Sequence, residues 1–247
     1  MLHFLYSSSL FQSFTEEEQV KFLQRYEGNE GFLEILQVAL SLNEVIAEVK
    51  RTMPPITEEV IRYFKQPRRS ILTCLKIEDN VYHYPFSECI KEKGPFIICL
   101  QQGDRMENVS LYCKGMLMPL FEMCYRQKRD LIILPFSDDV EEIRFEYGKS
   151  SIQSFDKFVA MFKKGDAKII PPLERIITIF EEADVKNQIE VMLITNNEIA
   201  NFSEGKVTEL IDVLKENSVS ITAVAISENL YEKNPMHFFE KMYFVNK

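Results

Sequence analysis

The residues best placed for chemistry form a short polar loop directly after an apolar run. Phe96 to Cys99 follow a Gly-Pro break, and an apolar segment resumes near Val109. The loop between them contains Gln101, Gln102, Gly103, Asp104 and Arg105. This pattern indicates a buried strand that delivers a loop to the start of a helix. Because open α/β sheets bind ligands outside the carboxyl ends of their strands, the loop is the first candidate for a binding site.

No other pattern in the chain supports catalysis. His83, His237 and the serines at 7–9 do not have the spacing of a nucleophile with its base. Neither G-x-x-x-x-G-K-[ST] nor G-x-G-x-x-G occurs, so the sequence lacks the usual phosphate-binding loops. We therefore expect no catalytic residues and no cofactor.

The cysteines favour a reducing compartment. They are five in number and include no C-x-x-C pair, and three of them lie within apolar periodic segments. Such residues are typical of buried small hydrophobes rather than of disulfides or zinc ligands. The five are Cys74, Cys89, Cys99, Cys113 and Cys124.

Charge and hydropathy limit the classes of partner and the cellular compartments that this protein is expected to have. The formal net charge of −9 argues against nucleic acid and anionic membranes, which require a concentrated basic face. The first fourteen residues lack the basic start of a signal peptide, and no apolar stretch approaches the ~18 residues of a membrane span. We expect a cytoplasmic protein without a membrane span.

The first ninety or so residues are predicted to be mainly helical. Thr15 followed by three glutamates is typical of a helix N-terminus with an acidic first turn, and this helix continues to about Tyr26. A broad apolar stripe predicts a second, longer helix. The further elements expected before residue 93 are helices at about 30–51 and 57–65 and a hairpin at 70–84.

From Gly94 onward, strands are predicted to alternate with helices. Apolar runs such as LIILPF and VMLIT are typical of a parallel sheet covered on both faces. Strands are expected at 96–100, 130–136, 189–195 and 221–227, an edge strand at 142–147, and helices at about 107–126, 154–162, 170–183 and 204–216. The predicted organisation is a helical N-terminal region with a short hairpin at 1–92 and a mostly parallel α/β domain at 93–247.

The order of several phrases resembles a von Willebrand factor A (VWA) domain. GPFIICL precedes the first loop, LIILPFSDDVEEI covers the second strand and its hairpin, and VMLITNNE and ITAVAIS match the fourth and fifth strands. FDKFVAMFKKGDAKIIPPLERII matches the loop and helix between them. The chain is most similar to the C-terminal VWA domains of bacterial proteins that partner MoxR-type AAA+ ATPases. The resemblance implies a Rossmann-like α/β fold preceded by helices.

The family's metal-ion-dependent adhesion site holds Mg²⁺ with an Asp-x-Ser-x-Ser loop, a Thr and a further Asp, since hard cations require oxygen ligands. At the matching positions this chain has Gln101, Gly103, Arg105, Ala167 and Asn196. No carboxylate remains at a ligand position, so the resemblance implies a degenerate site without metal. A shifted alignment that uses Asp104 or Asp166 would restore a ligand or two.

Two cations, Arg105 and Lys168, are expected to point toward the ion position and to disfavour metal. They either stand in for the ion, paired with an acidic group of a partner or with Asp104, Asp166 or Glu198, or they are solvated loop charges. The predicted partner-binding residues in the top loops are Gln101, Gly103, Asp104, Arg105, Ala167, Lys168, Asn196 and Asn197.

The resemblance implies a non-enzymatic adaptor that docks a protein partner through its top loops, for example a MoxR-type AAA+ ATPase or a client of that ATPase. Two alternatives stay open. One is a Rossmann-like enzyme that acts on a small molecule at the same crevice. The other is a regulatory protein that binds through its helical N-terminal region.

Overall fold

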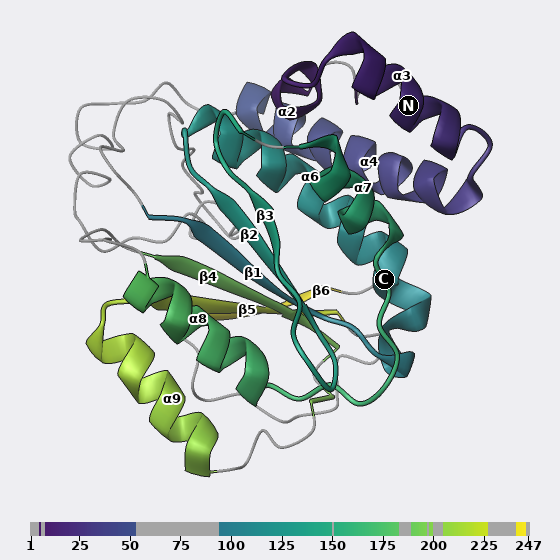
Figure 1. Ribbon diagram of the computed structural model, residues 1–247. Helices are drawn as coiled ribbons and strands as arrows, with labels where there is room; N and C mark the ends of the chain where they lie inside the picture. The colour runs from purple at the N-terminus through teal and green to yellow at the C-terminus, as the bar shows by residue number, and fades with distance from the viewer. Residues whose placement is uncertain are drawn as a thin grey trace.

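Figure 1 shows the computed structural model of the protein. The structure describes residues 5, 8–52, 94–149, 151–182, 189–196, 198–199, 205–226 and 241–245. The helix predicted at 57–65 and the hairpin predicted at 70–84 lie outside the described residues, as do Cys74 and Cys89.

A six-stranded sheet forms the centre of the molecule, in the order β3-β2-β1-β4-β5-β6. Its strands are β1 Phe96–Gln101, β2 Leu131–Phe136, β3 Ile143–Phe145, β4 Glu190–Thr195, β5 Ser220–Ile226 and β6 Lys241–Val245. All neighbours pair in parallel except β2 and β3, which form an antiparallel pair at one edge. The predicted mostly parallel sheet with an added edge strand is confirmed.

Side chains alternate between the two faces of the sheet, and each face has its own core. In β1, Phe96, Ile98 and Leu100 lie in one cluster, whereas Ile97 and Cys99 lie in the other. Both sets are at most 2% exposed. Burial on both faces accounts for the near-continuous apolar runs of β1, β2 and β4.

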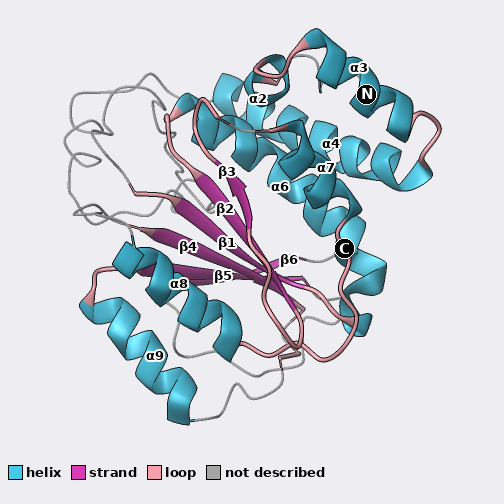
Figure 2. Ribbon diagram, viewed as in Figure 1, coloured by secondary structure: helices cyan, strands magenta, loops and turns pink. Residues whose placement is uncertain are grey.

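Helices cover both faces (Figure 2). On the first face lie α6 Ser110–Arg126 and α7 Ile152–Ala160, and on the second face lie α8 Ile170–Glu182 and α9 Gly205–Glu216. The α/β arrangement with helices on both faces is therefore the one the sequence predicted. The free cysteines of the described residues, Cys99, Cys113 and Cys124, are all buried, as expected.

The described N-terminal helices form an additional layer over α6 and α7 (Figure 1). They are α2 Ser9–Gln12, α3 Glu16–Tyr26 and α4 Glu30–Thr52. The predicted start of α3 is confirmed, because Thr15 and Glu18 form a reciprocal capping box. The long helix α4 crosses α6 at Gly115, where an added Cβ would lie 2.5 Å from the Val38 Cβ. Only glycine permits this approach of the two helices.

Polar and aromatic contacts reinforce this layer. The Tyr26 hydroxyl donates to the Asp156 carboxylate on α7 at 2.7 Å, and the Ser9 hydroxyl donates to Glu122 on α6 at 2.8 Å. The Phe22 and Phe155 rings lie 5.2 Å apart between centroids. The described N-terminal helices thus share one apolar core with the first face of the sheet. The domain boundary at residue 92 stays a prediction.

Two local expectations need correction. The segment after β1 was predicted to enter a helix near Glu107, but a 3₁₀ helix, η2 Asp104–Val109, comes first and α6 begins at Ser110. The short elements α2 and β6 were not predicted, because four or five residues carry too little periodicity. Within the described residues, no helix combines the length and apolarity needed to cross a bilayer.

Candidate functional site

The candidate site lies where β1 and β4 end side by side. The chain leaves β1 toward β2 on one side of the sheet and later returns to β4 on the other, so the strand order reverses between β1 and β4. In open α/β sheets this reversal produces the crevice in which ligands bind. Gln101 is the last residue of β1 and Thr195 is the last residue of β4.

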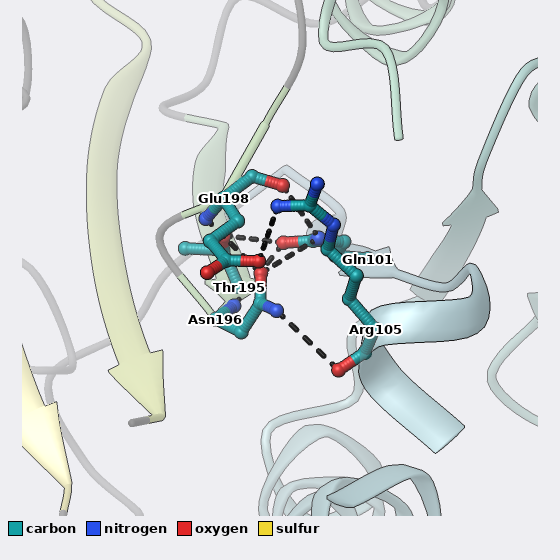
Figure 3. A network of polar contacts seen from close by, with 5 residues as sticks. All are labelled: Gln101, Arg105, Thr195, Asn196 and Glu198. Atoms are coloured by element: carbon teal, nitrogen blue, oxygen red, sulfur yellow. Dashed lines mark hydrogen bonds and ion pairs between the residues drawn. The ribbon is translucent and has the colours of Figure 1, made fainter. Parts of the chain in front are cut away.

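The Gln101 side chain makes hydrogen bonds to the last residue of β4 and to the loop after it (Figure 3). Its Oε1 accepts from the Thr195 hydroxyl and from the Asn196 backbone N–H, the latter at 3.1 Å. Its Nε2 donates to Asn196 Oδ1 at 2.8 Å and to the Glu198 carbonyl at 3.1 Å. A primary amide has two donors and two acceptor positions, so every hydrogen-bonding position of this buried amide is used.

An ion pair lies at the rim of the same crevice. Arg105 Nη1 and Glu198 Oε2 are 2.6 Å apart, and their side chains are 67% and 42% exposed. Asn196 ties the two loops together below this pair, since its Nδ2 donates to the Arg105 carbonyl at 3.4 Å and its Oδ1 accepts from the Glu198 N–H at 3.0 Å. The bond to Glu198 raises the pKa of Arg105 above its usual range.

Two glycines allow the neighbouring loops to approach by their backbones. Gly103 has a φ of 112°, and a Cβ there would lie 2.4 Å from the Gly165 carbonyl oxygen. Gly165 has a φ of 102°, and its Cβ would lie 2.4 Å from Asp138 Oδ2. The Gly103 N–H also donates to the Lys163 carbonyl at 2.8 Å. The loops after β1, β2 and α7 are thus packed against one another.

A buried lysine fixes the start of the loop after α7. Lys114, on α6, is 3% exposed, and its Nζ donates to the carbonyls of Val159 at 2.7 Å and Met161 at 2.6 Å. Burial lowers the pKa of Lys114 to about 8, so the ammonium form still predominates at pH 7. These two hydrogen bonds hold the chain just before Lys163, whose carbonyl accepts the hydrogen bond from the Gly103 N–H.

Lys168, the second predicted cation, lies in an ion pair with a neighbouring loop. It pairs with Asp138 on the loop after β2 at 2.9 Å, and its N–H donates to the Ser137 carbonyl at 2.9 Å. Asp138 was not among the partners predicted for this lysine. The Asp138 side chain lies against Gly165, so the β2 loop lies beside the segment that carries Lys168. Ala167, the neighbouring predicted residue, is buried at 6% exposure in the second core.

The other predicted site residues divide into those the structure joins and those it leaves apart. Gln101, Arg105 and Asn196 lie in one network, and the predicted internal pairing of Arg105 with Glu198 is confirmed. Asp104 is exposed at the start of η2, and Asn197 lies outside the described residues. Thr195 was not predicted as a site residue, because its only signal in the sequence was a hydroxyl at the last position of an apolar strand.

The residues present do not fit a divalent cation. Among the described residues, no three His, Cys, Asp or Glu side chains are close enough together to hold a metal ion. At the crevice the Gln101 Nε2 group presents hydrogens, not lone pairs, to the surrounding oxygens. The Arg105 guanidinium adds a positive charge at the rim. An amide donor and a cation in these positions oppose the binding of Mg²⁺.

No protein-family model matches the chain. An uncharacterized protein of Methanocaldococcus jannaschii is 26% identical over 155 residues, which cover 57% of this chain and 35% of that protein. The chain therefore spans about a third of the length of this relative.

Solved structures with a similar arrangement of elements include VWA domains. The SpRpn10 VWA domain has a TM-score of 0.49 and 12% identity, with 63% of this chain and 89% of that chain covered. The VWA2 paralog of ArnB from Sulfolobus acidocaldarius has a TM-score of 0.41 and 10% identity, covering 64% and 42%. The manganese-loaded TRAP protein of Plasmodium vivax has a TM-score of 0.45 and 11% identity, covering 63% and 69%.

The fold is VWA-like. The parallel sheet, its antiparallel edge hairpin after the second strand and the helices on both faces are those implied by the sequence resemblance. The similarity to the solved VWA structures concerns the arrangement of elements, and it assigns no ligand or partner to this chain.

Proposed function

We propose that this chain is a non-enzymatic protein-interaction module, an adaptor whose VWA-like domain docks a protein partner through the loops at the carboxyl ends of β1 and β4 without a metal ion. The sequence resemblance makes a MoxR-type AAA+ ATPase, or a client of that ATPase, the first partner to test.

One observation carries the proposal: the polar groups inside the crevice bond to one another. Both ends of the Gln101 amide are occupied by Thr195, Asn196 and Glu198. A small-molecule site needs convergent polar groups that are available to the ligand. The network instead fills the place where a substrate would bind, which supports docking at the rim over catalysis in the crevice.

The rim offers side chains of the kinds found in protein interfaces. Arg105 is 67% exposed, and Phe162 is 36% exposed on the loop whose next residue accepts the Gly103 N–H. Arginine and aromatic residues are enriched among residues that dominate binding energy. The Lys168–Asp138 and Arg105–Glu198 pairs balance the charge there, which favours a partner surface of mixed charge.

The experiment is affinity capture with the full chain from its native host, with bound proteins identified by mass spectrometry. We expect wild type to capture an AAA+ ATPase or a complex that such an ATPase remodels, both with Mg²⁺ and with EDTA added to the bait alone before capture. Arg105→Glu should weaken binding of the purified partner at least ~10-fold, because it places two like charges at the rim.

Lys21→Glu is the matched control, since Lys21 is also an exposed cation paired with a glutamate, on the N-terminal layer. It should leave capture unchanged. Equal loss of binding in both variants would contradict docking at the rim, and so would full binding by Arg105→Glu. Turnover of a metabolite by the purified chain would contradict the non-enzymatic part of the proposal.

A further inference from the structure

The Gln101 amide occupies a position between oxygen atoms that come from a different segment of the chain. Its Nε2 lies 2.8 Å from Asn196 Oδ1 and 3.1 Å from the Glu198 carbonyl oxygen (Figure 3). These are N–H···O distances, longer than the ~2.1 Å of Mg²⁺–O and ~2.4 Å of Ca²⁺–O contacts. The distances therefore fit an NH₂ group, and not an ion, at the position of Nε2.

We infer that the Gln101 amide takes the place of a cation, because it links the loop after β4 to the end of β1. A latent cation site exists at the same place, and the single substitution Gln101→Glu would make it able to bind an ion. The amide NH₂ directs two hydrogens to two oxygens, as an ion directs its charge. The linkage is neutral, so it avoids the large desolvation penalty of a buried ion. It also cannot be removed by a chelator.

The latent site follows from replacing the Nε2 donor by a carboxylate oxygen. The remaining oxygen of the new carboxylate would still accept from the Thr195 hydroxyl and the Asn196 N–H. The substituted oxygen would face Asn196 Oδ1 and the Glu198 carbonyl and would repel them. One carboxylate, one amide oxygen and one carbonyl form a ligand set that Ca²⁺, Mn²⁺ or Mg²⁺ accepts, with water completing the shell. This inference does not depend on a partner.

Arg105 is the group that could mask the effect. Its guanidinium already reaches Glu198 at the rim, and it could turn toward a new carboxylate and neutralise it. The double variant Gln101→Glu with Arg105→Ala removes that possibility. Arg105 is exposed, so its removal by itself should leave the fold intact.

The test is thermal unfolding of the full chain in EDTA and in ~10 mM CaCl₂, MnCl₂ or MgCl₂, with NaCl matched in ionic strength. Wild type should change by less than ~1 °C. Gln101→Glu, alone or with Arg105→Ala, should lower the Tm by about 5–10 °C in EDTA. The double variant should regain at least half of this loss in one of the divalent cations, since a ligand bound only by the native state stabilises it.

Gln19 provides a matched control elsewhere in the chain. Its Nε2 also donates to two carbonyls, those of Phe11 at 3.0 Å and Phe14 at 2.9 Å, in the N-terminal layer. Gln19→Glu creates the same repulsion, but at a half-buried side chain that faces two backbone carbonyls and no side-chain amide oxygen, so it should lower the Tm without a cation response of comparable size. A response of equal size in Gln19→Glu would overturn the inference.

Asn196→Asp keeps the inference testable if the Gln101 variants do not fold. It adds a carboxylate next to the crevice but leaves the Gln101 amide in place, so we expect no cation response from it. Stabilisation of wild type or of Asn196→Asp by several degrees would show that the amide does not exclude ions. Absence of any cation response in a folded double variant would equally overturn the inference.

Discussion

The two ends of the sheet join β1 to β4 by opposite means. At the carboxyl end the link is the neutral Gln101 amide. At the amino end it is a buried ion pair, in which Arg129 Nη1 contacts Glu190 Oε2 of β4 at 2.7 Å, with side chains 1% and 4% exposed. Arg129 Nε also donates to the Gly94 carbonyl at 2.9 Å, and its guanidinium carbon lies 5.6 Å from the centroid of the Phe96 ring of β1.

This difference in charge and burial separates the end of the sheet that supports the structure from the end that serves function. The buried pair is stable only while both charges are present, because each is desolvated and depends on the other. It therefore suits an end of the sheet that holds fixed positions. At the carboxyl end the charges lie at the exposed rim, and the buried part is neutral. Charges at a rim remain available to a partner, so we place function at this end.

The largest expected effect lies at the amino end. Glu190→Gln leaves the Arg129 charge buried without a counter-charge and should lower the free energy of unfolding by about 3 kcal/mol or more, measured by urea denaturation. Replacing both residues by Met should recover most of this loss. Glu17→Gln, in an exposed pair on α3, should not move the urea midpoint. An equally large loss in the double variant would show that the pair is not the source of the effect.

Gly103→Ala should have the next largest effect. A side chain at φ 112° is strained, and its Cβ would meet the Gly165 carbonyl at 2.4 Å, so we expect a loss of about 2–4 kcal/mol in urea denaturation. Gly28→Ala is the control, since Gly28 has a φ of 72° but nothing within 4 Å of an added Cβ. It should cost about 1 kcal/mol. Equal losses would mean that close packing of the loops contributes nothing.

Thr195→Val isolates one bond of the neutral network. It removes the hydroxyl that donates to Gln101 Oε1 while the shape stays similar, and it should cost about 1–2 kcal/mol. In Thr178→Val, the lost hydroxyl donates to the Glu174 carbonyl on the exposed side of α8. That variant should differ from wild type by less than ~0.5 kcal/mol. If Thr195→Val were as stable as wild type, the carboxyl-end link would be weaker than its geometry indicates.

The smallest effect on stability is expected for the rim itself. Arg105→Ala should leave the urea midpoint unchanged, because an exposed ion pair adds little to stability. Partner capture, in contrast, should fall. If Arg105→Ala lost stability but kept its partner, the carboxyl end of the sheet would have to be assigned to structural support and not to function.

The fold could be predicted because its strands are long apolar runs separated by amphipathic helices. LIILPF and VMLIT are buried on both faces, and the composition of these segments leaves few alternatives. The conformation of the turn after β1 was harder to predict. Met106 and Val109 are buried but are spaced for the tighter 3₁₀ helix, which the expected α-helical periodicity did not distinguish.

The site could be predicted in part. Gln101 ends one predicted strand and Asn196 follows another. Both were therefore expected at the same edge of the sheet, since the carboxyl ends of parallel strands lie together. Their hydrogen bonds depend on side-chain rotamers and on loop conformations that local sequence does not determine. For the same reason Asp138 was not predicted as a partner of Lys168, since the contact between Gly165 and Asp138 joins loops that are far apart in the chain.

The crossing of α4 and α6 at Gly115 bears on the order in which the chain folds. During synthesis α4 leaves the ribosome well before α6, so the side chains that it presents to Gly115, among them Val38, cannot make this contact until α6 follows. The N-terminal helices of a nascent chain would therefore expose apolar surface for that interval. Chaperones that recognise such surface would find it on α4 before α6 is made.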